Sequence, residues 1–405
     1  MKRSRSREFC AHLRFPVVFL VAGFGGLMSC SASKSTGASS IAQNSSWPRL
    51  AIVFDDVGAQ SALGREAKRG AMMALNCDEP TDASGSFAVQ GAGVTALFAN
   101  DTTASDAARD AVLAVGFTDS DELREALPSF AAAGTSIIVA GATDPCLLRL
   151  PGGEHLRFAC YSDPAQAAAM AEFAFDRLSA RTVTVLFDAR SEFARAVGIA
   201  FSTRFRALEK TTIATEAFAG DYRDPFTKVA HSNPDAVYLA ALPSDAPRAV
   251  AMLRAQGYRG VILGPDSFDG IELNAQKDEG RIFFSTHAFL AARGESATES
   301  FVARYRAKYG TMPTGFAALG YDATCMALAA IAAAQSHGAV TRESIARAVE
   351  LLGPTDGLSG TIAFAPGERF ATKPVWILEV RQAEQSLAAR WGPARIPAAQ
   401  CDDAH

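Results

Sequence analysis

The sequence lacks the short motifs that mark the common enzyme classes. It contains no phosphate-binding glycine loop, no Gly-x-Ser-x-Gly turn and no His-Glu-x-x-His helix. It has only six histidines, and none lies in a pattern that suggests a catalytic triad or a metal site. We therefore expect a protein that is not an enzyme.

Cysteine is scarce and is not arranged for metal binding. No Cys-x-x-Cys pair and no Cys/His spacing typical of zinc occurs, so we expect no metal and no cofactor. Cys146 and Cys160 are the nearest pair in sequence, and the sequence leaves open whether they form a disulfide or only pack in the core. The cysteines beyond residue 30 are Cys77, Cys146, Cys160, Cys325 and Cys401. Because five is odd, at least one of them is free.

The N-terminus lacks an apolar run long enough to cross a bilayer. A basic segment precedes FPVVFLVAGFGGLM, which is shorter than the ~20 residues that a span requires. This order is typical of an export signal over residues 1–29. The ending Leu27-Met28-Ser29-Cys30 resembles a bacterial lipobox, which would make Cys30 the lipidated first residue of a membrane-anchored envelope protein. The alternative is an ordinary signal peptide with a chance cysteine.

The chain also lacks an excess of positive charge. Residues 1–29 carry five basic residues and one acidic residue, so their removal changes the net charge from −4 to −8. An acidic protein is not expected to bind nucleic acid. The following residues, 30–48, are rich in Ser, Ala and Gly and are expected to form a flexible tether.

From residue 49 the chain alternates short β-like runs with helical segments. This alternation predicts an α/β protein with parallel sheets wound by right-handed crossovers. The expected strands are 50–54, 94–99, 111–117, 136–140, 182–187, 235–242, 260–264 and 281–286. They are followed by expected helices at 294–309, 315–337 and 341–352 and strands near 360–365 and 374–380.

The two αβ halves, 48–160 and 161–285, are similar in plan, which predicts two lobes facing each other. We expect lobe 1 to comprise 49–160 and about 287–340. Lobe 2 would comprise 161–286 and about 341–385, and residues 386–405 would form a C-terminal tail.

Small and polar residues follow several of the expected strands. In open parallel sheets, ligands bind beyond the carboxyl ends of the strands, where helix N-termini offer free N–H groups. The residues at these ends are Thr118–Ser120, Gly141–Thr143, Asp188–Phe193, Leu242–Ser244 and Pro265–Asp266. The sequence therefore predicts a ligand site at these strand ends.

Several longer segments together carry a family resemblance. They are AIVFDDVGAQSALGREAKRGAMMAL, FANDTTASDAARDAV, ALPSFAAAGTSIIVAGATDP, RFACYSDPAQAAAMAEFAFDRLSARTVTVLFD, DYRDPFTKVAHSNPDAVYLAA, GYRGVILGPDSFDG, GFAALGYDATCMALAAI and GLSGTIAFAPGER. In this order the chain resembles the leucine/isoleucine/valine-binding family of periplasmic solute receptors, from residue 49 to about 380. The resemblance implies the type I periplasmic-binding-protein fold, in which two lobes are joined by a hinge of several crossovers.

The resemblance also implies a ligand site. Ser120 and Thr143 match positions whose hydroxyls hold an amino-acid carboxylate, and Gly141 matches one whose carbonyl helps to receive the ammonium. Asp266 matches an acidic position that pairs with that ammonium. The other matched positions around the ligand are Leu63, Phe193, Leu242 and, after a one-residue shift, Asp163.

Each of these residues also has a structural interpretation. Ser120 could be an N-cap, Gly141 to Pro145 an ordinary turn, and Asp266 a loop cap. Asp55 and Asp56 could be paired carboxylates for acid–base catalysis, but adjacent side chains need not converge.

The expected function is a lipoprotein that closes its lobes around a small ligand and presents it to an ABC permease in the inner membrane. The ligand would be a branched-chain or other amino acid, or an amide-like solute. The alternative is an envelope lipoprotein that uses the same fold as a sensor or protein-interaction scaffold, with a degenerate pocket.

Overall fold

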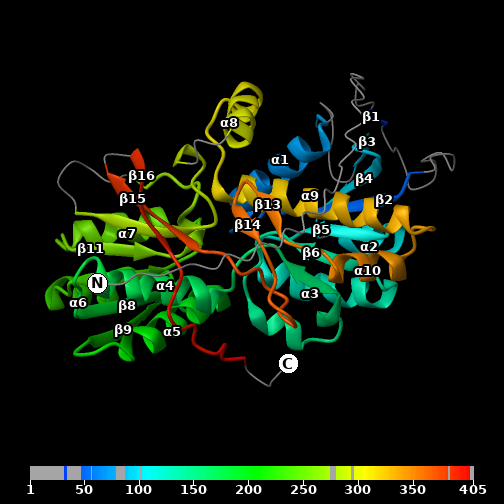
Figure 1. Cartoon of the computed structure of the whole chain (residues 1–405). Coiled ribbons are helices and arrows are strands. Elements are labelled where there is room, and N and C mark those ends of the chain that lie inside the picture. The colour runs from blue at the N-terminus through cyan, green and yellow to red at the C-terminus, as the bar shows by residue number, and fades with distance from the viewer. Residues whose placement is uncertain are drawn as a thin grey trace, which may run out of the picture.

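The computed structural model describes residues 32–33, 47–55, 57–78, 87–100, 103–273, 280–292, 296–381 and 384–401. These residues form two seven-stranded sheets, each at the centre of one lobe (Figure 1). The expected export signal, Cys30 and most of the expected tether lie outside the described residues. Within the tether, Ala32–Ser33 form the short strand β1.

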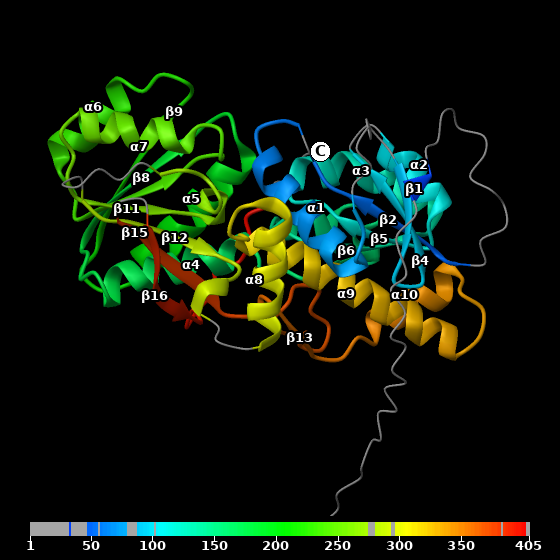
Figure 2. The ribbon, with the colours of Figure 1, turned by 90° about the horizontal axis from the view of Figure 1, so that it is seen from above.

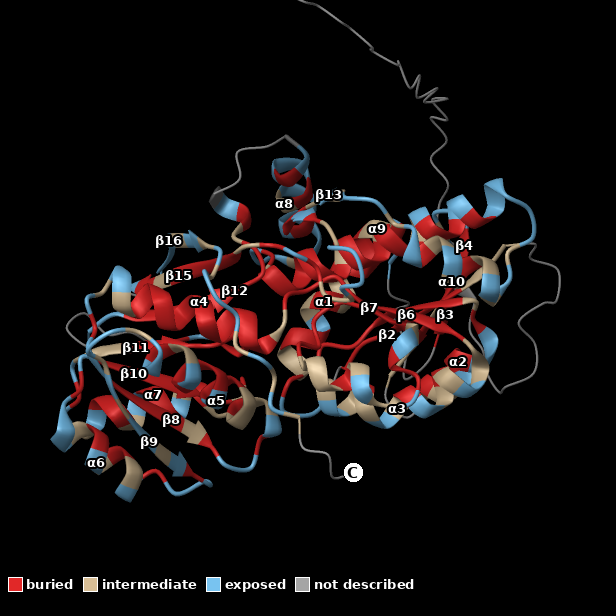
Figure 3. Ribbon diagram, turned by 60° about the horizontal axis from the view of Figure 1, so that its bottom comes forward, coloured by how far each residue is buried: buried red, intermediate tan, exposed pale blue. Residues whose placement is uncertain are grey.

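The lobe 1 sheet has the strand order β1-β3-β4-β2-β5-β6-β7, with β4, β2, β5, β6 and β7 parallel. Its central strands are buried on both faces, because Leu50 and Ile52 pack in one apolar cluster and Ala51 and Val53 in another (Figure 3). The bounds are β2 Arg49–Val53, β3 Phe87–Gly91, β4 Val94–Ala99, β5 Leu113–Gly116, β6 Ser136–Val139 and β7 Leu156–Phe158. β3 was not expected from the sequence; it pairs antiparallel with β4.

The lobe 2 sheet has the order β16-β15-β12-β11-β10-β8-β9, in which β15 is antiparallel to both of its neighbours, β12 and β16. The bounds are β8 Thr182–Asp188, β9 Thr212–Phe218, β10 Ala236–Ala240, β11 Val261–Gly264, β12 Ile282–Thr286, β15 Val375–Arg381 and β16 Glu384–Trp391. A separate hairpin is formed by β13 Thr355–Gly357 and β14 Gly360–Ile362. The expected strands from 182 to 286 are thus confirmed, and β9 is an additional edge strand.

Helices flank both sheets (Figure 2). In lobe 1 they are α1 Ser61–Leu75, α2 Ala104–Asp110, α3 Ser120–Ala133, α8 Ser296–Tyr309, α9 Gly315–Ser336 and α10 Arg342–Glu350. In lobe 2 they are α4 Asp163–Asp176, α5 Glu192–Arg206, α6 Asp224–Ser232 and α7 Ala246–Ala255. Short 3₁₀ turns occur at η2 Pro145–Arg149, η3 Gly153–His155, η4 Asp266–Phe268 and η5 Leu290–Ala292.

Two glycines allow α1 and α9 to pack backbone to backbone. A Cβ atom on Gly70 would lie 1.9 Å from the carbonyl oxygen of Ala317, and one on Gly320 would lie 1.9 Å from that of Ala67. Both positions therefore require glycine. α9 is also the one described helix long and apolar enough to cross a membrane, and about two thirds of it is buried inside the protein.

The chain crosses between the lobes between β7 and α4, between β12 and α8, and between β14 and β15 (Figure 1). The last crossover corrects the expected boundary, because residues 341–385 do not all join lobe 2. Ile345 and Val349 of α10, with Ile362 and Ala371, pack in the lobe 1 cluster around Leu50. Only β15 and β16 extend the lobe 2 sheet, so the segment expected as a tail begins inside a strand.

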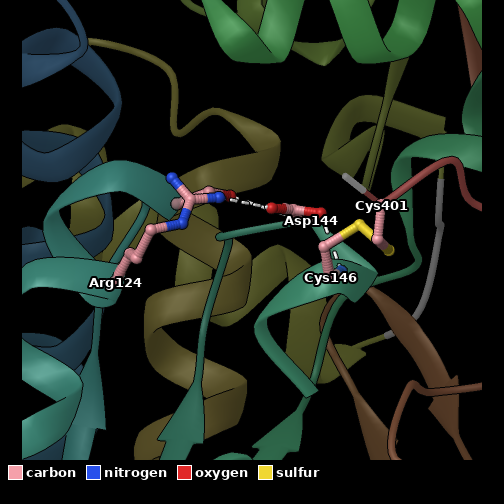
Figure 4. Close-up of a disulfide and its surroundings, with 5 residues drawn as sticks. Arg124, Asp144, Cys146 and Cys401 are labelled. Carbon is pink, nitrogen blue, oxygen red and sulfur yellow. Dashed lines mark hydrogen bonds and ion pairs between the residues drawn. A yellow bond between two sulfur atoms is a disulfide. The ribbon is translucent and has the colours of Figure 1, made fainter. Parts of the chain in front are cut away.

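Cys146 forms a disulfide with Cys401, 255 residues later, and not with Cys160 (Figure 4). Cys160 is fully buried, and its thiol donates to the carbonyl oxygen of Ala142 at 3.2 Å. Cys146 instead lies in η2, at the surface of lobe 1 next to Asp144. Cys77, Cys160 and Cys325 are not part of this disulfide; the first two are buried and Cys325 is half-buried.

The C-terminal segment reaches this disulfide from lobe 2. Glu172 of α4 accepts hydrogen bonds from the indole of Trp391 and from the backbone N–H groups of Ala394 and Arg395. Arg204 of α5 donates to the same carboxylate at 2.7 Å. Burial alone would raise the pKa of Glu172, but these donors outweigh it and lower the pKa, so the carboxylate is ionised at neutral pH. We call residues 392–401 the C-terminal strap, because they connect lobe 2 with Cys146 of lobe 1.

Candidate ligand-binding site

The carboxyl edge of the lobe 1 sheet meets lobe 2 through a buried hydrogen bond. Thr143, beyond β6, donates from its hydroxyl to Oδ1 of Asp163, the first residue of α4, at 2.7 Å. The backbone N–H of Asp163 donates to the carbonyl oxygen of Thr143 at 2.9 Å. Both side chains are at most 3 % exposed. Two predicted site residues from different lobes are therefore in direct contact.

Gln166 extends this contact to Asp266 in lobe 2. Its Nε2 donates to Oδ1 of Asp163 and to Oδ1 of Asp266, each at 3.0 Å. Its Oε1 accepts from the backbone N–H of Asp266 at 3.0 Å and from the hydroxyl of Ser285 at 2.8 Å. The amide of Gln166 thus fixes the two carboxylates relative to each other in a fully buried network.

His287 supplies the second partner of Asp266. Its Nε2 lies 3.0 Å from Oδ2 of Asp266, and its ring stacks on Tyr161 with centroids 3.9 Å apart. Burial lowers the pKa of His287, although the Asp266 carboxylate acts in the opposite direction. A neutral ring that donates from Nε2 satisfies this geometry. The Asp266 carboxylate therefore has protein partners on both oxygens.

Two other buried carboxyl groups that interact electrostatically with Asp266 have raised pKa values. Burial raises the pKa of Asp163 well above its usual range, and the charge of Asp266 adds to the rise. Burial also raises the pKa of Asp269 to about 7, although Thr286 and the Gly315 N–H donate to it. No described basic side chain forms an ion pair with Asp163 or Asp269.

Gly141 lies under an aromatic ring and does not face an open pocket. A Cβ atom at this position would lie 2.8 Å from the ring of Phe316, the second residue of α9, and 3.3 Å from the methyl group of Thr118. Phe316 in turn contacts His287 edge to face, with centroids 5.4 Å apart. In this structure Gly141 gives room to Phe316, and a larger residue would have to displace the ring.

The other predicted residues lie outside the Thr143–Asp266 network. Leu63 is buried in the core of lobe 1, and Phe193 packs on the core of lobe 2. Leu242 is half-buried at the start of α7, where its carbonyl oxygen accepts from Asp245 and Ala246. Ser120 is the first residue of α3 and its hydroxyl accepts from the N–H of Asp144 at 3.3 Å; the N-cap is Asp119.

Gln166, His287, Tyr161 and Phe316 were missed by the sequence analysis. Gln166 lies three residues after Asp163 on α4, a spacing that brings both side chains to one face of the helix. This spacing was the available signal. Nothing in the local sequence of His287, just beyond β12, indicates that it meets Asp266.

A cavity of about 720 Å³ lies between the lobes. It is bordered by Arg65, Glu66 and Arg69 of α1, the loop 269–273 of lobe 2 and residues 311–314 before α9. Its size suits a small solute. None of the eight predicted site residues borders it. In the part of the chain that the structure describes, no three His, Cys, Asp or Glu side chains are grouped to hold a metal ion.

The sequence profile of the periplasmic binding proteins matches residues 49–385, which is most of the chain and includes both lobes. The chain belongs to the periplasmic binding protein family. This family consists of extracytoplasmic proteins that bind substrates and are not enzymes. The expected two-lobed α/β fold is confirmed.

Solved structures with the same architecture include two branched-chain amino-acid receptors. The leucine binding protein LivK from Thermotoga maritima is 25% identical, with a TM-score of 0.73 over 85% of this chain and 99% of that one. LivJ from Streptococcus pneumoniae, in complex with isoleucine, is 21% identical, with a TM-score of 0.70 over 85% and 98%.

A solute binding protein from R. palustris, in complex with benzoate, has the same architecture. It is 16% identical, with a TM-score of 0.71 over 87% of this chain and 98% of that one. No curated protein matches the chain significantly by sequence. The similar folds thus bind chemically different small molecules.

Proposed function

We propose that this periplasmic binding protein captures a small solute between its two lobes and delivers it to an ABC permease. The observation that carries the proposal is the buried network of Thr143, Asp163, Gln166, Asp266 and His287, which joins the carboxyl edge of lobe 1 to lobe 2. Contacts of this kind stabilise a closed arrangement of the lobes. A solute that touches both lobes would shift the open–closed equilibrium further toward closure.

The direct test is a thermal-shift screen of the purified mature protein. The panel comprises amino acids, amides, urea, short aliphatic acids, aromatic acids and organic amines. A solute that binds the folded state raises the melting temperature by mass action. A panel without any positive compound would contradict solute capture and support the alternative, a scaffold with a degenerate pocket.

Thr143→Ala is expected to weaken the binding of any solute found in this screen by about tenfold. The reason is the loss of a buried hydrogen bond between the lobes, which contributes about 1 to 1.5 kcal/mol to the closed state. Calorimetry of the variant measures the change. Thr361→Ala, on the exposed face of β14, is the control and should bind as the wild type does. Equal affinity of Thr143→Ala and the wild type would contradict the assignment.

We further propose that Cys30 carries a lipid anchor in the cell envelope. Leu27-Met28-Ser29-Cys30 supports this proposal. Cys30→Ser is expected to move the protein from the membrane fraction to the soluble extracytoplasmic fraction, because the modified thiol is lost. Fractionation followed by immunoblotting measures the distribution, and Cys10→Ser is the control. Retention of the Cys30→Ser protein in the membrane fraction would contradict the anchor.

A further inference from the structure

Three polar side chains at the carboxyl edge of the lobe 1 sheet have buried atoms without a hydrogen-bond partner among the described residues. Both carboxylate oxygens of Asp55 are of this kind, as are Oγ1 of Thr118 and Oε2 of Glu122. Asp55 and Thr118 are only 3 % and 4 % exposed. A buried carboxylate without a partner is costly, so such groups usually have a ligand, an ion or a water molecule as partner.

The sheet register brings Asp55 and Thr118 to the carboxyl ends of neighbouring strands. Val53 of β2 pairs with Gly116 of β5, and each polar residue follows two positions later on its own strand. The Phe117 N–H donates to the carbonyl oxygen of Val53 at 2.8 Å, so the two chains stay adjacent past the end of the regular pairing. Parallel strands bring these side chains to the same edge of the sheet, the edge from which Thr143 contacts lobe 2.

Glu122 belongs to the same corner. A Cβ atom on Gly58, in the loop that follows Asp55, would lie 4.0 Å from Oε1 of Glu122. Gln60 of that loop donates to the Asp119 carboxylate at 2.9 Å, which ties the loop to the first turn of α3. The Asp55 strand end and the Glu122 helix end thus border one polar corner, which we call the Asp55 corner: Asp55, Thr118, Asp119 and Glu122.

Among the described residues, no basic side chain forms an ion pair with the carboxyl groups of this corner. Burial raises the pKa of Glu122 to about 7, and repulsion by Glu125 contributes. Burial likewise raises the pKa of Asp119. The nearest cation on α3, Arg124, instead pairs with Asp121 and Asp144. A bound cation would stabilise the ionised forms of these carboxyl groups and would pair with acceptor atoms that have no partner among the described residues.

We propose that the solute captured by the lobes is a small organic cation with N–H donors, a primary amine or a guanidinium compound, whose charged group binds Asp55, Glu122 and Thr118. This assignment rests on the proposed function, because it names the chemical class of the captured solute. The ammonium partner expected from the sequence, Asp266, already accepts hydrogen bonds from Gln166 and His287. Asp55 and Glu122, by contrast, have carboxyl oxygens without a hydrogen-bond partner among the described residues.

The test is calorimetric titration of the mature protein with agmatine, putrescine and arginine as cationic probes. Leucine, benzoate and sodium chloride serve as zwitterionic, anionic and inorganic-cation probes. At least one organic cation is expected to bind at least tenfold more tightly than leucine and benzoate. Asp55→Asn, which preserves shape, is expected to weaken that binding at least tenfold, and Thr118→Val and Glu122→Gln are independent variants if Asp55→Asn folds poorly. Asp106→Asn, on the exposed side of α2, is the matched control and should bind as the wild type does.

The outcomes separate this inference from the proposed function. Binding of leucine or benzoate, without binding of the organic cations, would overturn the cation assignment and leave solute capture intact. Cation binding that is unchanged in Asp55→Asn, Thr118→Val and Glu122→Gln would overturn the Asp55 corner as its site, as would binding of sodium alone. If none of the probes binds, both the cation assignment and the proposed solute capture are overturned. Selective loss of cation binding in the three corner variants, with the control unchanged, would establish the site.

Discussion

Replacing both Cys146 and Cys401 by serine is expected to lower the free energy of unfolding by about 5 kcal/mol. The disulfide closes a loop of 255 residues, and restriction of the unfolded chain increases with loop length. For a chain of this size that loss corresponds to a melting temperature lower by roughly 7 °C. Differential scanning calorimetry and urea denaturation of the oxidised proteins measure the effect.

Reductant provides the matched control for this prediction. Dithiothreitol should destabilise the wild type by a similar amount and leave the double variant unchanged. Cys325→Ser, which removes a free cysteine and keeps the disulfide, should respond to reductant as the wild type does. A double variant as stable as the oxidised wild type would show that the strap adds nothing to stability.

Asp269→Asn is expected to stabilise the protein at pH 8 by up to about 4 kcal/mol and to have little effect at pH 4. Burial raises the pKa of Asp269 from 3.8 to about 7, so the folded state holds a proton that the unfolded state releases. Below pH 4 both states are protonated. As the pH rises from 4 to 7 the unfolded state is increasingly favoured, and the loss of stability is complete above pH 7.

The amide suits this position because one oxygen of Asp269 makes both hydrogen bonds. Oδ2 accepts from the hydroxyl of Thr286 at 2.7 Å and from the N–H of Gly315 at 2.8 Å, and an amide oxygen can accept the same two. The difference in unfolding free energy between Asp269→Asn and the wild type should therefore grow between pH 4 and pH 7. Asp356→Asn on the exposed hairpin is the control. A difference independent of pH would contradict the raised pKa.

The central strands of the two sheets were predictable because their apolar runs are continuous. Leu50–Phe54 and Ala236–Ala240 are buried on both faces, and such runs are unambiguous when helical segments separate them. β9 was missed because it is an edge strand with a mostly exposed sequence, Thr212–Phe218. The lobe to which α10 belongs was also predicted wrongly, because its apolar residues Ile345 and Val349 would suit either core.

The site was only partly predictable, because the polar partners come from distant parts of the chain. Thr143 and Asp266 were identified through their strand ends, and the structure places both in one network. Gln166 and His287, which contact Asp266 directly, join the network through tertiary contacts that a local sequence pattern does not predict. Asp55 was considered as half of an acidic pair with Asp56, which lies outside the described residues. Only the folded structure shows that the Asp55 carboxylate is buried without a hydrogen-bond partner among the described residues.

The number of residues in the C-terminal strap limits how far the two lobes can move apart at the hinge. Arg395 is fastened to lobe 2 through Glu172, and Cys401 is fastened to lobe 1 through Cys146. Six residues of extended chain span at most about 20 Å, so these two anchor points cannot separate further while the disulfide is intact. The strap therefore limits how widely the lobes can open on that side.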